Sequence, residues 1–223
     1  MRYALAAALL ALAACAEPAA PPATPAAITP VETEAPSGAY AIDPSHTQVL
    51  FSADHLGFAR YTTNFTDMRA ELTLDTADPT RSRLDAAIGV RSLQLDHAPD
   101  GFMDIMMGEH FFDAARYPEM TFRSTSIELT GPNTARVIGD FTLRGVTRPL
   151  TLDVTFNGGY AGHDLERNAR IGFSARGALS RSAFGMDFGL PPEGSNMGVA
   201  DEVEIVIEAE FTGPAWTPPT QTP

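Results

Sequence analysis

HFFDAARYPEMTFRSTSIEL (residues 110–129) and ARVIGDFTLRGVTRPLTLDVTF (residues 135–156) are the two parts of the stretch that decides the fold. Three segments within it alternate apolar or small residues with polar ones: Met120, Phe122, Ser124 and Ser126, then Val137, Gly139, Phe141 and Leu143, then Leu150, Leu152, Val154 and Phe156. A period of two residues is typical of antiparallel strands with one buried and one solvated face. This pattern places Ile127 on the solvated face, and the turns between segments are too short to hold a helix.

The same alternation recurs on both sides of this stretch. It covers residues 49–53, 68–74 and 84–90 before the stretch, and residues 171–179 and 203–211 after it. About eight antiparallel strands must either close or protect their edges, so we predict an all-β fold with a closed antiparallel barrel of about eight strands. The inward positions mix Phe and Leu with Ala and Gly, which suits either a cavity or a packed core.

The composition and charge bound the class of protein. The chain has 223 residues, of which 44% are hydrophobic, enough for one good-sized domain. The formal net charge of -13 argues against nucleic-acid binding through a broad basic face. All 15 basic residues are arginine. A chain without lysine has neither a Schiff-base lysine nor a Walker-type phosphate loop.

The two ends of the chain differ from its middle. Residues 1–14 resemble a secretory signal peptide, and Leu12-Ala13-Ala14-Cys15 resembles the lipobox of bacterial lipoproteins, although an ordinary signal peptide with a chance cysteine is the alternative. We expect lipidation of Cys15, an Ala/Pro-rich tether over residues 15–38, a barrel domain over 39–212 and a flexible tail over 213–223. A lipid anchor predicts a cell-envelope protein that faces the periplasm. The absence of Asp after Cys15 favours the outer membrane.

Catalytic and metal-binding patterns are weak. The five histidines show neither H-x-H nor H-E-x-x-H spacing, and Cys15 is the only cysteine. Gly172-Phe173-Ser174-Ala175-Arg176 fails the nucleophile-elbow pattern at its last position. An enzyme would need two titratable groups on one cavity wall, and Asp43 with His46 is the pair to inspect. We predict a protein that is not an enzyme, with no metal and no catalytic residue.

An irregular segment carries soft apolar side chains. Residues 100–112 break the alternation, and Phe102, Ile105 and Met106 share a helical face, so we predict short helices across an open end of the barrel. Methionines there suit a flexible apolar ligand at a barrel mouth, and simple plugging of that end is the alternative. Arg144 and Arg181 fall at strand ends, where they would meet either an anionic head group or neighbouring acids.

Several spaced motifs occur together in one order: Tyr40-x-Ile42-Asp43-x-x-His46, Phe111-Phe112-Asp113, Tyr117-Pro118-x-Met120-x-Phe122, Gly139-Asp140-Phe141-Thr142-Leu143-Arg144-Gly145, Arg181-x-x-Phe184-Gly185 and Asp201-Glu202-Val203. With these motifs the chain resembles the YceI family of lipocalin-like bacterial proteins from about Tyr40 to Phe211. The resemblance implies an antiparallel eight-stranded barrel, usually periplasmic, whose interior holds a long polyisoprenoid such as a prenyl diphosphate or a quinone tail. It implies neither an enzyme nor a metal.

The sequence therefore predicts a non-enzymatic carrier lipoprotein that holds an isoprenoid lipid in its barrel and has no other cofactor. The alternatives are a structural or stress-protective envelope protein without a small ligand, and an unrecognised enzyme that acts in the pocket. The predicted ligand-binding residues come from the apolar interior, the methionine-rich segment as its gate, and two arginines: Phe51, Leu72, Phe102, Met103, Met106, Met107, Phe111, Phe122, Phe141, Leu143, Phe156, Phe173, Phe184, Arg144 and Arg181.

Overall fold

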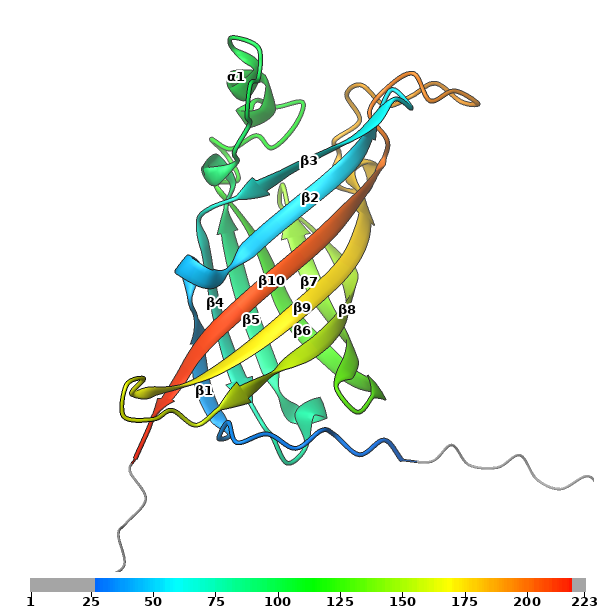
Figure 1. Cartoon of the computed structure of the whole chain (residues 1–223). Coiled ribbons are helices and arrows are strands. Elements are labelled where there is room, and N and C mark those ends of the chain that lie inside the picture. The colour runs from blue at the N-terminus through cyan, green and yellow to red at the C-terminus, as the bar shows by residue number, and fades with distance from the viewer. Residues whose placement is uncertain (1–26, 218–223) are drawn as a thin grey trace, which may run out of the picture.

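A computed structural model describes residues 27–217 and consists mainly of β-strands (Figure 1). The strands are β1 (Gly38–Ile42), β2 (Gln48–His55), β3 (Ala59–Phe65), β4 (Met68–Leu74), β5 (Arg83–Gly89), β6 (Glu119–Gly131), β7 (Thr134–Leu143), β8 (Val146–Tyr160), β9 (Asn168–Ser180) and β10 (Glu202–Ala215). Between them lie helix α1 (Phe102–Met107) and the short 3-10 helices η1 (Pro44–His46), η2 (Pro79–Arg81), η3 (Val90–Ser92) and η4 (Arg181–Phe184). Within residues 27–217, no helix is long and apolar enough to cross a membrane.

The strands form one antiparallel sheet that closes on itself. β1 and then β4 to β10 follow one another around a ring, and pairing of β1 with β10 closes it. β2 continues along the edge of β10 beyond β1, and β3 pairs with β2. The predicted eight-stranded antiparallel barrel is confirmed. Closure satisfies the strand edges around the ring, which an open sheet would expose.

The barrel has two unlike ends, which we call upper and lower after their places in Figure 1. The upper end carries α1, the β2–β3 turn and the loop over residues 187–199. The lower end carries the β6–β7 turn, the β8–β9 turn and both ends of the described chain. Residues 27–37 run beneath the lower end, so α1 and the N-terminal segment lie at opposite ends of the barrel.

A β-bulge in β6 changes which of its side chains face inward. The register between β6 and β7 shifts between Ser124 and Ser126, and one extra residue reverses the two faces of a strand beyond it. Ile127 and Leu129 therefore face the barrel interior. The predicted placement of Ile127 on the solvated face is wrong for this reason. On β7, which has no bulge in this region, the four predicted inward positions between residues 137 and 143 are all buried.

Large side chains fill the upper half of the barrel. This upper cluster includes Phe65, Phe112, Phe122, Phe141 and Phe184. Phe65 meets Phe112 edge-on at 5.8 Å between ring centroids, and Phe141 meets Phe184 in the same way at 5.6 Å. A smaller cluster in the lower half is built around Ile171 and Phe211. The packing is therefore uneven along the barrel axis.

The predicted flexible segments differ from the structure at their borders with the barrel. Residues 30–37 of the predicted tether lie against the barrel, where Ala35 is 3% exposed and the Tyr40 hydroxyl donates a hydrogen bond to the Pro36 carbonyl. β10 continues to Ala215, so the predicted tail over residues 213–223 begins inside the last strand. The predicted signal peptide and Cys15 lie outside the described residues.

Candidate functional site

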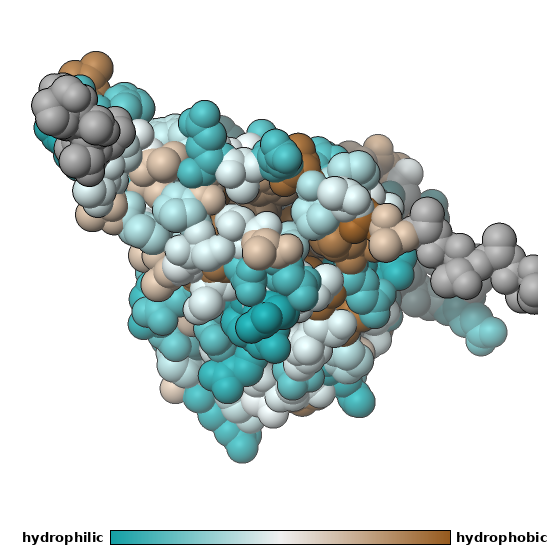
Figure 2. Space-filling model, turned by 90° about the horizontal axis from the view of Figure 1, so that it is seen from below, coloured by the Kyte–Doolittle hydropathy of each residue, from teal (hydrophilic) through white to brown (hydrophobic). Residues whose placement is uncertain are grey.

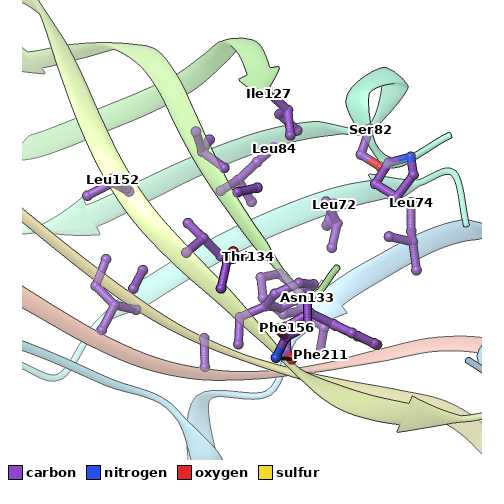
Figure 3. A pocket seen from close by; sticks show the side chains of 18 of the residues that line it. Leu72, Leu74, Ser82, Leu84, Ile127, Asn133, Thr134, Leu152, Phe156 and Phe211 are labelled. Atoms are coloured by element: carbon purple, nitrogen blue, oxygen red, sulfur yellow. Dashed lines mark hydrogen bonds between the residues drawn. The ribbon is translucent and has the colours of Figure 1, made fainter. Parts of the chain in front are cut away.

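The lower half of the barrel contains a cavity of about 210 Å³ that opens at the lower end. Its wall is built from inward-facing side chains on β4 to β10 together with the β6–β7 turn. Figure 3 shows some of them converging on this space: Leu72 and Leu74 of β4, Leu84 of β5, Ile127 of β6, Leu152 and Phe156 of β8, and Phe211 of β10. The alternation in the sequence was compatible with either a cavity or a packed core. The barrel has both: a packed core in its upper half and a cavity in its lower half.

Alanines at inward positions make room for the cavity. Five of them line it, each on a different strand: Ala70, Ala86, Ala135, Ala175 and Ala209. Ala70 and Ala86 are directly paired across β4 and β5, so two short side chains face the same space. Three aromatic rings complete this lining, because Phe173 lies 5.5 Å from Phe156 and 6.0 Å from Phe211 between ring centroids.

The lining of the cavity is almost entirely apolar. Of its 28 residues, five are polar and uncharged: Thr33, Thr76, Ser82, Asn133 and Thr134. Among the described residues, no acid, base or thiol borders it. Seen from below, apolar surface is visible between the polar residues of the lower end (Figure 2). A cavity with such a lining suits apolar molecules.

Residues 30–33 cross the mouth of the cavity, and we call them the strap. Pro30, Val31 and Thr33 line the cavity themselves. The Val31 amide donates a hydrogen bond to the Pro132 carbonyl (2.7 Å), and the Thr33 hydroxyl donates a longer one to the Gly159 carbonyl (3.4 Å). The strap is therefore a thin wall with few attachments.

The chain just beyond the strap is held more firmly. Ala35 is buried in the lower cluster. A Cβ on Gly159 would lie only 3.1 Å from the Ala35 Cβ, so the two backbones run close together. The hydroxyls of Ser37 and Thr76 lie 2.9 Å apart. These contacts fix one end of the strap to the barrel.

Three of the fifteen predicted ligand-binding residues line the cavity, namely Leu72, Phe156 and Phe173. The other twelve do not: Phe51, Phe102, Met103, Met106, Met107, Phe111, Phe122, Phe141, Leu143, Phe184, Arg144 and Arg181. Most of the apolar ones pack in or against the upper cluster. Their inward orientation follows from the alternation, but alternation does not show which half of a barrel is hollow.

The methionine-rich segment lies at the upper end of the barrel. It forms the predicted short helix, α1, and Met103, Met106 and Met107 pack against the upper cluster. Because the segment lies at the opposite end from the cavity mouth, it is not the gate of this cavity, and plugging, the alternative, agrees with the structure. Flexible methionine side chains fill irregular gaps well, which suits the uneven top of a barrel.

Arg181 binds the backbone of the upper loop, and few of its N–H donors remain for the head group of a ligand. The residue is 4% exposed, and its guanidinium donates to four backbone carbonyls, those of Met186, Phe188, Val199 and Ala200, at 2.6–3.0 Å. Burial lowers the pKa of this guanidinium, although nearby acids oppose the shift. The Arg181-x-x-Phe184-Gly185 motif thus fixes the loop over residues 187–199.

Arg144 also holds the upper end together. Arg144 and Gly145 have φ values of 52° and 71°, as in tight two-residue turns between antiparallel strands. The Arg144 side chain donates hydrogen bonds to the carbonyls of Gly185 (2.8 Å) and Glu109 (2.9 Å). A Cβ on Gly145 would lie 2.7 Å from the Tyr117 ring. This position therefore favours glycine both for its positive φ and for the close approach of the ring.

Asp43 and His46 lie outside the cavity, on the surface of the barrel. His46 Nδ1 is 2.9 Å from Asp43 Oδ2, while Arg170 donates to that same oxygen (2.7 Å) and to Glu210 Oε2 (2.9 Å). Arg170, and then His46, hold the pKa of the Asp43 carboxyl well below its usual range. The potential ligand atoms of Asp43, His46 and Glu210 lie within 4.8 Å of one another, but the Arg170 guanidinium already donates to both carboxylates. The cluster ties the end of β1 to β9 and β10, where the ring closes.

Sequence reasoning missed the strap and gave too little weight to the alanines. The strap lies in a segment whose Pro, Ala and Thr content is typical of a tether. A usable signal was present in the alanines, because Ala70, Ala86, Ala175 and Ala209 interrupt runs of large inward residues on strands that become neighbours in a closed barrel.

The closed antiparallel barrel and its apolar cavity define a lipocalin-like binding barrel. A family model, described as YceI-like domain, matches residues 40–211. The chain belongs to the YceI family.

Known proteins agree with this assignment. A UPF0312 protein from Pseudomonas savastanoi pv. phaseolicola is 36% identical over 149 residues, covering 66% of this chain and 76% of the relative. The crystal structure of BcnA from Burkholderia cenocepacia has a TM-score of 0.64 at 25% identity and covers 76% of this chain and 98% of its own. A polyisoprenoid binding domain from Saccharophagus degradans, implicated in plant cell wall breakdown, has a TM-score of 0.54 at 14% identity, covering 78% of this chain and 98% of its own.

Proposed function

We propose that the protein binds the hydrocarbon end of an isoprenoid lipid in the lower cavity and catalyses no reaction on it. The cavity itself is the observation that carries this proposal, since its lining is apolar and no titratable group of the described residues borders it. Removal of apolar surface from water contributes about 25 cal/mol per Å², so such a site binds without specific polar contacts. The domain from S. degradans, at 14% identity, supports the architecture alone.

The volume of the cavity limits how much of the ligand enters. An apolar protein cavity of about 150 Å³ binds benzene, with its six carbon atoms, so a cavity of 210 Å³ accommodates about eight carbon atoms. This amounts to about one and a half isoprene units at the same density. A long polyisoprenoid therefore inserts only its end, and the remainder stays outside the lower mouth.

The charges near the mouth favour a ligand without an anionic group there. Glu32 and Glu34 border a second, shallower hollow that adjoins the strap and shares Val31 and Thr33 with the cavity. Asp78 caps η2, which contributes Pro79 to the cavity lining. Glu32 and Glu34 would repel a diphosphate on the strap side, while η2 carries the exposed Arg81 as well as Asp78; a quinone or an alcohol meets no such repulsion. Of the two ligand types expected from the sequence, the uncharged one fits better.

We include the lipid anchor at Cys15 in the proposal, which would hold the protein at a membrane of the cell envelope on its periplasmic side. The described chain begins at residue 27, beneath the lower end of the barrel. The twelve residues from Cys15 to that point span at most about 40 Å. An anchor at this end would keep the cavity mouth near the membrane, where isoprenoid lipids are dissolved.

A cavity-blocking substitution tests the proposed function. Ala175→Phe places an aromatic ring in the cavity, and Ala178→Phe makes the same change on the exposed face of β9. Both are made in the Cys15→Ser background, so that no attached acyl chain competes, and ligand binding is measured as displacement of N-phenyl-1-naphthylamine by farnesol.

We expect micromolar binding to the parent protein and to Ala178→Phe, and binding at least tenfold weaker to Ala175→Phe. The added ring occupies the volume of about six carbon atoms, most of the space available. Equal binding by the two phenylalanine variants, or no displacement from the parent protein, would contradict the proposal.

A further inference from the structure

We infer that Phe122 and Leu152 form the inner end of the cavity and set the length of hydrocarbon that it accepts. The inference rests on the proposed function, because it concerns the same cavity. It assigns a task to Phe122, which does not line the cavity, and to Leu152, which does.

Phe122 fills the layer directly behind the cavity. It is paired with Ala86 of β5, which lines the cavity, and it is 8% exposed. Its ring lies where a Cβ on Gly139 would be, so the ring covers that glycine. Gly139 is paired with Ser124, one step nearer the lower end than Phe122 along β6. The ring therefore extends from its own level toward the cavity.

Leu152 of β8 covers a glycine of β9 in the same way. Like Val137, Leu152 lines the cavity and also belongs to the upper cluster, so it stands at the border between the hollow and packed halves. Leu152 is directly paired with Gly177 of β9. A Cβ on Gly177 would lie 2.7 Å from Leu152 Cδ2.

These two glycines explain why two side chains suffice to end the cavity. β7 and β9 have no side chain at Gly139 and Gly177, and the space left over them is filled by Phe122 and Leu152 from neighbouring strands. Behind them the upper cluster continues with Phe141 and Phe184. A hydrocarbon that enters from the lower mouth meets this inner end after about eight carbon atoms.

A homologous series of straight-chain primary alcohols measures that depth. The probes run from six to sixteen carbon atoms, and their affinity for the Cys15→Ser protein is measured by displacement of N-phenyl-1-naphthylamine. Each methylene that enters the cavity tightens binding about fourfold. Each methylene beyond the inner end stays outside and adds less than about twofold, so the plot of affinity against length has a break near eight carbons.

The variants and their controls are matched. Phe122→Ala removes a ring of about six carbons, and Leu152→Ala removes about three, so the break moves to longer alcohols by up to those amounts. The controls Phe184→Ala and Leu143→Ala make the same truncations deep in the upper cluster, away from the cavity, and leave the break in place. Ala86→Leu fills the cavity instead of enlarging it, and moves the break to shorter alcohols. Where a truncation prevents folding, this variant still tests whether the depth of the cavity sets the position of the break.

The outcomes separate the inference from the proposed function. Shifts in the two end variants and in Ala86→Leu, but not in the controls, support the inference. A break at one length in all folded variants, or affinity that rises steadily through sixteen carbons in the parent protein, overturns it and leaves the proposed function standing. Failure of every alcohol to bind the parent protein overturns the proposed function, and the inference with it.

Discussion

Replacement of Val31 by proline should speed the exchange of a bound ligand about fivefold and change its equilibrium affinity by less than twofold. Proline has no amide hydrogen, so the substitution removes the 2.7 Å hydrogen bond from Val31 to Pro132 that holds the strap across the mouth. A hydrogen bond of this kind contributes about 1 kcal/mol net, which corresponds to about a fivefold larger population of the open strap. If the strap must open before a ligand passes, uptake and release accelerate together.

The assay is stopped-flow fluorescence of N-phenyl-1-naphthylamine release into excess farnesol. Ile28→Pro is the matched control, because it introduces the same residue in the same segment at a position that neither lines the cavity nor donates a backbone hydrogen bond within the described part of the chain. Its release rate should equal that of the parent protein. Equal rates for the two proline variants, or a fivefold loss of affinity at an unchanged release rate in Val31→Pro, would refute a gating strap.

Three further predictions concern stability and anchoring. Arg181→Met should lower the free energy of unfolding by at least about 3 kcal/mol, because it leaves four carbonyls without their donor. The control Arg123→Met, at a residue 77% exposed, should change it by less than about 0.5 kcal/mol. Both free energies are measured by urea titration. Asp43→Asn should cost about 1–2 kcal/mol at pH 7. Arg170 and His46 lower the pKa of Asp43 in the folded state, so the contribution of Asp43 to stability is present above the unfolded pKa of about 4 and is lost as the pH falls below that value. The stability of Asp43→Asn should therefore fall less steeply than that of the parent protein between about pH 4 and pH 2. Parallel profiles of stability against pH would count against the pairing. Cys15→Ser should abolish labelling by radioactive palmitate and release the protein from the membrane fraction, and persistent labelling would contradict the lipobox assignment.

The alternation in the sequence predicts the barrel well where the strands are regular. On β7, Val137, Gly139, Phe141 and Leu143 are buried as their period of two requires. The same rule fails for Ile127, because the bulge in β6 inserts one residue and reverses the faces beyond it. A bulge depends on how a strand fits its neighbour around the ring, and the sequence of one strand does not reveal it.

The site was harder to predict than the fold. Phe122 and Phe156 look alike in the sequence, since both are inward phenylalanines, yet one lies behind the cavity and the other lines it. The difference arises from the neighbouring strands: the Phe122 ring reaches over Gly139, which is paired with Ser124, whereas Phe156 is paired with Phe173, one pair away from Ala175. These relations depend on register. The charge of Arg181 suggested an anion ligand. The sequence does not reveal the four backbone carbonyls to which the side chain donates.

Photo-crosslinking tests most directly whether the lower half of the barrel holds the ligand. A prenyl alcohol with a diazirine at its terminal carbon is bound to the Cys15→Ser protein and irradiated, and the modified residues are identified by mass spectrometry. We predict adducts on the lower cavity wall, within residues 84–86, 152–156 and 173–175, and their loss when farnesol is present in excess. Adducts concentrated in residues 102–112 at the upper end, or adducts that excess farnesol does not suppress, would contradict this account.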